Sequence, residues 1–328
     1  MGMITIGDPG GAAISSIAYS AHGLLLSSSW DGCARVYDTS YKHAETYPSA
    51  GNAPLLDCAW LNASTAVFGG LDGNLDCVQM GGRPTRLGKH KDAISAIATL
   101  SDRIISGSWD KSVKITDARS GSSVETQLLE KVFCLDAVDD RVVVATANRA
   151  IWIYDARQMS QPFEKRESSL KYSTRCVTCN PNGSGYVTSS IEGRVAVELF
   201  DPSPESQEQR YAFKCHRQND DASDETVAYP INDVQYHPVH GTFATAGGDG
   251  VVAIWDAAAR KRLRQYPRLE ASVASIAFSP SGRHLAMACS SGIEDGRPDD
   301  DSVIALHIRE LAVDEGRPKV AASTTSIR

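Results

Sequence analysis

The sequence has no long hydrophobic run. Its strongest apolar segment, residues 141–147, is only as long as a β-strand, whereas a membrane helix needs about 18 apolar residues. The start of the chain has neither the basic region nor the apolar region of a signal peptide, and Ile6 stands where a myristoylation signal has Ser or Thr. We therefore expect no contact with a membrane.

Excess positive charge is absent as well. The 328 residues include 33 Lys and Arg against 40 Asp and Glu, which gives a formal net charge of −7. Such a chain lacks the cationic field that drives non-specific binding to nucleic acid. With 42% hydrophobic and 22% charged residues, the composition is typical of a globular protein with a buried core. We expect no direct nucleic-acid partner.

Clustered metal ligands and catalytic motifs are scarce. Among the eight cysteines, only Cys176 and Cys179 lie close together, and in a strand-like run side chains three apart point to opposite faces. His237 and His240 form a second pair without further ligands, which is typical of a turn. The sequence has no nucleophile elbow, P-loop, dinucleotide fingerprint or zinc-protease motif. These absences predict no metal, no cofactor and no enzymatic activity.

One pattern recurs seven times along the chain. Small residues precede a turn that carries Asp-Gly or a related pair, and an alternating β-rich strand follows. An insertion interrupts the seventh copy. The turns of the first six copies carry Asp31, Asp72, Asp110, Asn148, Glu192 and Asp249. They lie 41, 38, 38, 44 and 57 positions apart, around the roughly 40 to 45 residues of a four-stranded WD-repeat blade.

These repeats predict an all-β fold, a seven-bladed β-propeller of WD repeats. A single blade cannot bury both faces of its sheet, so the blades must stack around an axis. Seven blades of about 40 residues use most of the chain, which favours one domain over residues 1–312. The short strand near Met3 is expected to close the ring within the last blade. Insertions near 202–229 and 291–301 and a polar tail over 313–328 complete the predicted organisation.

Two tryptophans depart from what the repeat requires. Trp30 and Trp109 each directly precede a turn Asp, where other blades have Leu, Ala, Ile or Gly. This turn faces the rim around the channel, where an indole is hard to bury completely, and Trp is enriched at interface hot spots. Each is either an interface anchor, which we favour, or packs against the neighbouring blade. Trp60, Trp152 and Trp255 lie inside strand patterns and are expected in the core.

Blade five differs from the others in charge. Its turn Asp is replaced by Glu192, and the segment 157–217 carries nine basic and seven acidic residues. This segment is net +2, while the remainder of the chain is net −9. A small basic island on an acidic protein favours an acidic or phosphorylated peptide as the ligand. The alternative is that some of these cations form salt bridges on solvated strands.

Four strings around blade five resemble one known family. They cover Arg166–Cys176, Ser189–Glu198, Asp201–Glu205 and Tyr211–Arg217. They look like the Bub-type WD-repeat propeller of the mitotic spindle assembly checkpoint, the non-kinase partner of the Bub kinase. The resemblance covers essentially the whole chain. A sister family, the messenger-RNA-export propeller, shares part of these strings but is usually longer at the N-terminus, and the Arg-Glu-Ser-Ser and Asp-Pro-Ser-Pro-Glu strings favour the checkpoint branch.

The resemblance implies a non-enzymatic adaptor with two peptide sites. Members bind GLEBS motifs of the Bub kinase and of its pseudokinase relative on the top face of the ring. They also read phosphorylated Met-Glu-Leu-Thr repeats on an outer-kinetochore scaffold. Carried over by motif, the residues that contact the GLEBS peptide are Trp30, Trp109, Glu192 and Arg194, and those that hold the phosphothreonine are Arg217 and Lys214. His240 and Gly241 stand where relatives have a basic residue in blade six.

The same resemblance implies the cellular setting. Components of ubiquitin-ligase and checkpoint complexes are further expected partners, with the chain as a monomeric propeller inside hetero-complexes. The expected locations are the nucleus, the kinetochore in mitosis and, in part, the cytoplasm. The alternative function is that of the messenger-RNA-export propeller, which docks on a nucleoporin GLEBS motif.

Overall fold

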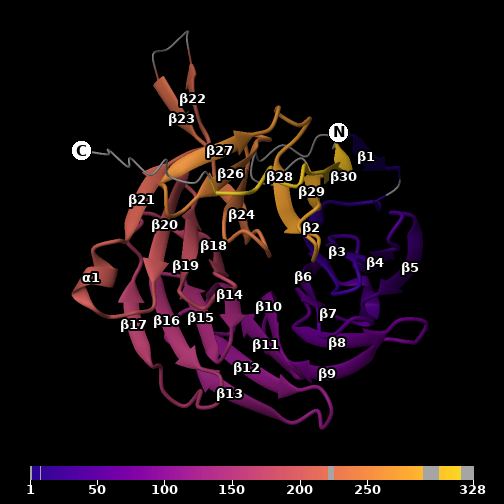
Figure 1. Ribbon diagram of the computed structural model, residues 1–328. Coiled ribbons are helices and arrows are strands. Elements are labelled where there is room, and N and C mark those ends of the chain that lie inside the picture. The colour runs from indigo at the N-terminus through magenta and orange to yellow at the C-terminus, as the bar shows by residue number, and fades with distance from the viewer. Residues whose placement is uncertain (1, 8, 221–224, 291–302, 319–328) are drawn as a thin grey trace, which may run out of the picture.

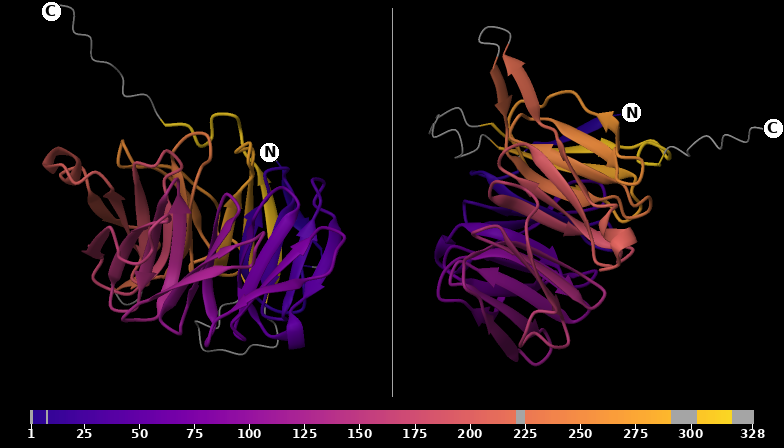
Figure 2. Two further views of the ribbon diagram at one scale, coloured as in Figure 1. Left: turned by 90° about the horizontal axis from the view of Figure 1, so that it is seen from below. Right: turned by 90° about the vertical axis from the view of Figure 1, so that its left-hand side faces the viewer.

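Seven four-stranded antiparallel sheets surround a central axis like the blades of a propeller (Figure 1). The structure is a computed structural model and describes residues 2–7, 9–220, 225–290 and 303–318. Seen edge-on in Figure 2, the ring is a disc with two separate faces. The predicted all-β, seven-bladed fold is confirmed. In the described part of the chain, no helix has the length and apolarity needed to cross a bilayer.

The first four blades follow one another along the chain. Blade one comprises β2 (Ile14–Tyr19), β3 (Leu25–Ser29), β4 (Cys33–Tyr37) and β5 (His43–Pro48), and a 3-10 turn, η1 (Ala50–Asn52), follows it. Blade two comprises β6 (Leu55–Trp60), β7 (Thr65–Gly70), β8 (Asn74–Gln79) and β9 (Thr85–Lys89). Blade three comprises β10 (Ile94–Leu100), β11 (Arg103–Ser108), β12 (Ser112–Asp117) and β13 (Ser123–Gln127). Blade four comprises β14 (Val132–Val138), β15 (Arg141–Thr146), β16 (Ala150–Asp155) and β17 (Glu164–Glu167).

The last three blades contain the additional elements. Blade five comprises β18 (Thr174–Cys179), β19 (Gly185–Ser190), β20 (Arg194–Leu199), the helix α1 (Pro204–Gln207) and β21 (Tyr211–Lys214). A separate hairpin of β22 (Arg217–Asp220) and β23 (Glu225–Ala228) extends beyond the rim of the ring (Figure 1). Blade six comprises β24 (Ile231–Tyr236), β25 (Phe243–Gly247), β26 (Val252–Asp256) and β27 (Lys261–Gln265). Blade seven comprises β28 (Val273–Phe278), β29 (His284–Ser290), β30 (Ile304–Glu310) and β1 (Met3–Ile6).

Burial follows the position of a strand within its blade. The second strand of every blade is almost entirely buried, because each sheet is covered on both faces by its neighbours. The outermost strands, such as β5 and β13, are largely exposed. Side chains from adjacent blades share core clusters, as where Val132 and Leu135 pack with Ile105 and Val113. The core therefore lies between blades, and the ring holds together through these interfaces.

The N-terminal strand closes the ring as predicted. β1 pairs with β30 in a register that runs from Met3 opposite Arg309 to Ile6 opposite Leu306. The His307 ring links this strand to the loop before blade seven, with Nδ1 2.9 Å from Thr5 Oγ1 and Nε2 2.6 Å from Glu270 Oε1. After β30, the chain packs back on blade six, where Thr242 donates a hydrogen bond to the carbonyl of Gly316. The predicted insertion at 291–301 and the end of the predicted tail, 319–328, lie outside the described residues.

Three carboxylates that line the central channel, one buried and two half-buried, connect neighbouring blades near the axis. Asp57 accepts a hydrogen bond from the backbone N–H of Ile97 (2.6 Å), and Asp136 accepts one from Cys179 (2.7 Å). Asp233 accepts from the N–H of Ile276 at 2.8 Å. These contacts join blade two to three, four to five and six to seven. Burial raises the pKa of Asp57 and of Asp136 to about 6, and the nearby charge of Asp233 adds to this effect.

These raised pKa values predict a stability that increases on mild acidification. An Asp whose pKa is about 4 when unfolded and about 6 when folded stabilises the fold fully below pH 4, and this stabilisation is lost as the pH rises through 6. Between pH 7.5 and pH 5, each such carboxyl adds about 1.4 kcal/mol to the free energy of unfolding. Asp57→Asn should remove one such increment, as measured by urea unfolding at both pH values. The exposed Glu205→Gln should leave the pH dependence unchanged, and equal slopes in all three proteins would contradict this account.

Candidate functional site

The innermost strand of every blade carries a β-bulge at the same place. In each case, pairing with the second strand shifts register between the first and the third residue of the strand. A bulge turns the extra side chain away from the regular pleat. The seven second residues all line the central channel: Ser15, Leu56, Ser95, Phe133, Arg175, Asn232 and Ala274. We call the face at which these strands begin the upper face.

The central channel has a volume of about 940 Å³. Trp30 and Trp109 line it together with Ile191, each from the turn between the second and third strands of its own blade. Both indoles are half-buried, and Ile191 is 45% exposed. The backbone N–H of Trp30 donates to the carbonyl of Ala13, directly before the innermost strand of blade one. The two predicted anchor residues therefore lie at the upper mouth of the channel, partly open to solvent.

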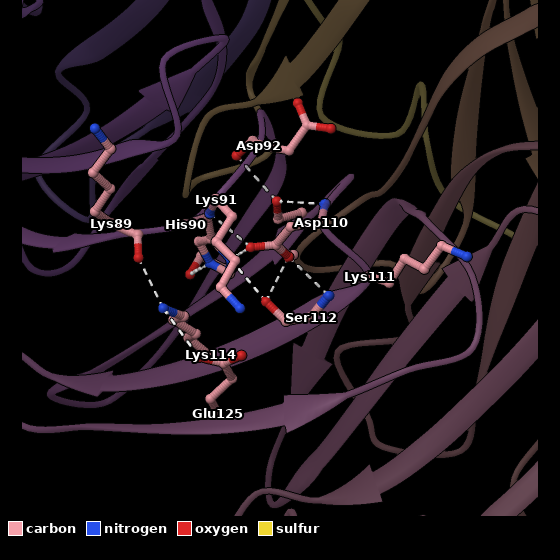
Figure 3. Close-up of polar contacts among 12 residues, drawn as sticks. Lys89, His90, Lys91, Asp92, Asp110, Lys111, Ser112, Lys114 and Glu125 are labelled. Carbon is pink, nitrogen blue, oxygen red and sulfur yellow. Dashed lines mark hydrogen bonds and ion pairs between the residues drawn. The ribbon is translucent and has the colours of Figure 1, made fainter.

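The turn that carries Trp109 is held rigidly by Asp110 (Figure 3). One carboxylate oxygen of Asp110 accepts from the N–H of Lys91 (2.8 Å), and the other accepts from the N–H of Ser112 (2.9 Å). His90 Nδ1 lies 3.2 Å from Asp110, and its Nε2 lies 2.8 Å from Ser106 Oγ. Burial lowers the pKa of His90, which keeps its ring neutral at physiological pH. This network fixes the backbone of Trp109 and leaves its indole available.

Trp30 is held by a different arrangement with the same result. The neighbouring Asp31 accepts from the backbone N–H of Cys33 (3.0 Å) and from that of Gly11 (3.2 Å). Arg35 pairs with Asp31 at 2.6 Å. Burial opposes ionisation of this carboxyl, but the hydrogen bonds from Arg35 and the backbone outweigh it and lower the pKa of Asp31. In blade one, Arg35 and the backbone N–H of Gly11 thus hold the turn Asp as His90 and the backbone N–H of Lys91 do in blade three.

The turn pattern alone does not indicate two further residues, Lys131 beside Trp109 and Phe133 in the channel. The ammonium of Lys131 lies 5.5 Å from the centre of the Trp109 ring, a cation–π contact. Phe133 lines the channel from the bulge of blade four. Alignment of the innermost strands could have identified Phe133 from the sequence, because most blades have a smaller residue at the equivalent position. Trp109 therefore has a positive charge beside its ring, and Phe133 adds an aromatic side chain to the lining of the same channel.

The four predicted residues of blade five come together at one turn. Arg217 donates from Nη2 to the carbonyl of Glu192 (2.8 Å), and the Glu192 carboxylate lies 3.6 Å from Arg194 Nε. Lys214 stands opposite Arg194 in the pairing of β20 with β21. Glu192 Oε1 and Arg217 Nε are buried and have no hydrogen-bond partner among the residues that the structure describes. The predicted GLEBS and phosphopeptide residues of this blade thus form one continuous cluster with unused hydrogen-bonding capacity.

Gly193 explains why this turn is narrow. Its φ is +65°, and a Cβ at this position would lie 2.6 Å from the carbonyl oxygen of Cys215 and 3.1 Å from that of Tyr229. The loop on either side of the protruding hairpin therefore presses directly on the turn. Next to it, His216 Nδ1 bonds to Asp249 at 2.8 Å, which ties the same loop to blade six. The position of Arg217 is set from both sides.

The structure divides the basic segment 157–217 between blades four and five, rather than placing it in blade five alone, and most of its arginines are paired. Arg157 pairs with Asp155 (2.6 Å), Arg166 with Glu164 (2.7 Å) and Arg210 with Glu198 (3.2 Å). The salt-bridge alternative thus holds for these three cations. Lys165, Lys171 and Lys214 are exposed, and Arg217 is half-buried beside the turn of Glu192, so cations remain available to a ligand at several places in the segment.

The close cysteine pair has no features of a reactive or metal-binding site. Cys176 faces Asp233, with Sγ 3.4 Å from a carboxylate oxygen, and Cys179 is buried beside Tyr186 and Phe200. Burial raises the pKa of both thiols well above the usual value, so both stay protonated. Among the residues that the structure describes, no three His, Cys, Asp or Glu side chains gather in a way that could hold a metal ion.

Comparison with known proteins places the chain in a family. The WD domain, G-beta repeat profile matches residues 5–38, 82–117 and 223–256. The chain is 40% identical over 324 residues to the mitotic checkpoint protein BUB3.1 of Arabidopsis thaliana, covering 96% of this chain and 94% of the relative. The chain belongs to the Bub3 family. The resemblance inferred from the strings of blade five is confirmed.

Two proteins of one organism allow the identity of this chain to the Bub3 family and to its sister family to be compared. In Schizosaccharomyces pombe, the spindle assembly checkpoint protein bub3 is 40% identical to this chain over 281 residues, which is 84% of the chain and 87% of the relative. The poly(A)+ RNA export protein of the same yeast is 31% identical over 302 residues, which is 88% of the chain and 84% of the relative. The higher identity to the Bub3 relative agrees with the checkpoint branch.

Proposed function

We propose that this chain is a non-enzymatic adaptor of the mitotic spindle assembly checkpoint. In this proposal, it binds GLEBS motifs of the Bub kinase and of its pseudokinase relative on its upper face. It recruits them to kinetochores by reading phosphorylated Met-Glu-Leu-Thr repeats. Membership of the Bub3 family supports the checkpoint role, because relatives from plant, worm and fission yeast are named as checkpoint proteins.

The observation that carries the proposal is the arrangement of the upper face. Two half-buried tryptophans, Trp30 and Trp109, stand at the channel mouth, and the cluster of Glu192, Arg194 and Arg217 lies on blade five. Trp side chains bring large contact area at low entropic cost, and a guanidinium can bind phosphate through two parallel hydrogen bonds. The tryptophans suit a peptide that crosses this face. The guanidinium groups suit an acidic or phosphorylated segment bound beside it.

The unpartnered polar atoms indicate where a ligand would gain most. Arg217 Nε is a buried donor with no hydrogen-bond partner among the described residues, and Glu192 Oε1 is a buried acceptor that has only the ion pair with Arg194 Nε at 3.6 Å. A buried polar group without a hydrogen bond costs about 1–3 kcal/mol. A ligand that supplies an anion to Arg217 and a donor to Glu192 would recover that cost.

Localisation in dividing cells separates the checkpoint function from the alternative export function. A fluorescently tagged full-length chain should accumulate at kinetochores of unattached chromosomes, and depletion should abolish mitotic arrest in a spindle poison. The messenger-RNA-export alternative requires a signal at the nuclear rim and retention of polyadenylated RNA in the nucleus. A nuclear-rim signal with an intact mitotic arrest would contradict the proposal.

A further inference from the structure

A second hollow lies on the side of the ring, between blades one and two. It has a volume of about 830 Å³, within the roughly 300–1,000 Å³ typical of ligand-binding clefts. One wall is β5, and the other is formed by β8, β9 and the loop that joins them, residues 80–84. Both walls stand at the outer rim (Figure 1), apart from the channel mouth. We call this hollow the lateral groove.

The lateral groove follows the open edge of a strand. Glu45, Thr46, Tyr47 and Pro48 line it as four consecutive residues of β5. Because successive side chains in a strand point to opposite faces, only a groove along the edge of the strand meets all four. Among the described strands, β5 is the last of its sheet and pairs only with β4. The open edge presents the N–H and carbonyl of Thr46 and the carbonyl of Pro48, which has no N–H, and these backbone groups can pair with an added strand.

Contacts across the floor keep the groove open and shaped. Gly81 donates its backbone N–H to Glu45 Oε2 (3.0 Å) and lies 3.2 Å from the hydroxyl of Tyr47. Glu45 and Tyr47 thus reach from β5 to the loop of blade two. These contacts hold the loop at a fixed distance from the β5 edge, beyond the reach of direct pairing between the two blades.

The charges of the groove favour an acidic occupant. The carboxylate of Asp76 is almost fully buried and pairs with Arg86 Nε at 2.6 Å, and Glu45 accepts from the backbone of Gly81. Asp76 and Arg86 therefore neutralise each other, and Glu45 is half-buried and held by a backbone N–H, so the exposed charged side chains of the groove are the two arginines. The Arg86 side chain is 40% exposed, and Arg83 on the same wall is exposed. Guanidinium groups of this kind match a carboxylate through parallel hydrogen bonds.

We propose that the lateral groove binds an extended acidic peptide segment of a partner protein, which adds to blade one as a fifth strand. Its backbone pairs with the edge of β5, and one of its carboxylates contacts Arg83 and Arg86. Four residues of β5 span about 13 Å, enough for a strand of four residues. This site is separate from the upper face and goes beyond the proposed checkpoint function, since it offers a second attachment point on the same ring.

The test uses the full chain, labelled with ¹⁵N and deuterium, and a capped hexapeptide of sequence Thr-Val-Glu-Val-Thr-Glu. Titration should shift the amide signals of residues 43–50 and 81–86, with a Kd of about 1 mM or tighter. Arg83→Glu, a change at an exposed position, should weaken binding at least about fivefold. A peptide methylated on alternate backbone nitrogens should bind at least about fivefold more weakly, because it cannot pair with a strand edge.

Three results would overturn this proposal. They are shifts confined to other parts of the ring, equal binding of the methylated peptide, and equal binding to Arg83→Glu. Trp30→Ala serves as the matched control, because it alters the upper face and should leave this titration unchanged. Since the groove and the upper face are probed by different ligands and variants, failure of one proposal is distinguishable from failure of the other.

Discussion

Replacement of both channel-mouth tryptophans should abolish binding of a GLEBS peptide. A Trp at an interface hot spot contributes about 2 kcal/mol or more, so Trp30→Ala and Trp109→Ala should each weaken binding about 30-fold. The two side chains belong to different blades, and effects at separated sites add. The double variant should therefore lose about 1,000-fold in affinity. Isothermal titration calorimetry with a synthetic GLEBS segment of the Bub kinase measures this loss.

Folding of these variants should remain intact, which makes the loss of binding interpretable. The backbone of the Trp109 turn is held by His90, Lys91 and Ser112 through Asp110, not by the indole. Val124→Ala is a matched control, because Val124 is 62% exposed on an outermost strand and distant from the turn pattern. Affinity of the double variant within about threefold of that of the parent chain would mean that the indoles pack against their own blades and do not anchor a ligand.

Charge reversal at Arg217 should have the second-largest effect. Loss of a hydrogen-bonded charge pair costs about 2–5 kcal/mol, so Arg217→Glu should weaken binding of a phosphorylated Met-Glu-Leu-Thr peptide about 100-fold. Arg217→Lys keeps the charge but loses the planar guanidinium. Its affinity for the phosphopeptide should lie between that of the parent chain and that of Arg217→Glu. Fluorescence anisotropy with the phosphorylated and the unphosphorylated peptide measures both the affinity and its dependence on phosphate.

The structure adds a cross-effect to this prediction. Arg217 donates to the carbonyl of Glu192, so its loss also loosens the turn that carries Arg194. One hydrogen bond contributes about 1 kcal/mol, and affinity for the GLEBS peptide should therefore fall about fivefold in Arg217→Glu. Lys165→Glu is the matched control, because Lys165 lies over the Trp152 ring on blade four and undergoes the same change in charge. An equal loss of phosphopeptide binding in Lys165→Glu would show that only net charge matters.

The sequence predicts this fold well because each blade encodes its own turns. Asp110 and Asp31 cap the turns that their positions in the repeat indicate, and the strands between them alternate as a buried sheet requires. The sequence also predicts that the segment at Met3 closes the ring, because the edge strand of the last blade would otherwise be unpaired. The two half-buried tryptophans at the channel mouth could be located because they occupy a position that a repeat leaves free.

The details of the site depend on contacts that no single repeat encodes. The bond between Arg217 and Glu192 arises because the loop around the protruding hairpin folds back on Gly193. The neutralisation of Arg210 by Glu198 depends on how the loop after α1 returns to β20. The lateral groove arises from the path of residues 80–84 relative to β5. Each of these features joins segments whose distance in space is set by the ring rather than by local pattern.

The account rests on the claim that one peptide crosses the upper face from the tryptophans to the turn of blade five. A crystal structure of the chain bound to the GLEBS segment of the Bub kinase tests this most directly. We predict contacts with Trp30 and Trp109 and an acidic side chain of the peptide at Arg194, with Arg217 still accessible to a phosphopeptide. A GLEBS segment bound on the outer rim or on the opposite face, with both indoles uncovered, would contradict the account.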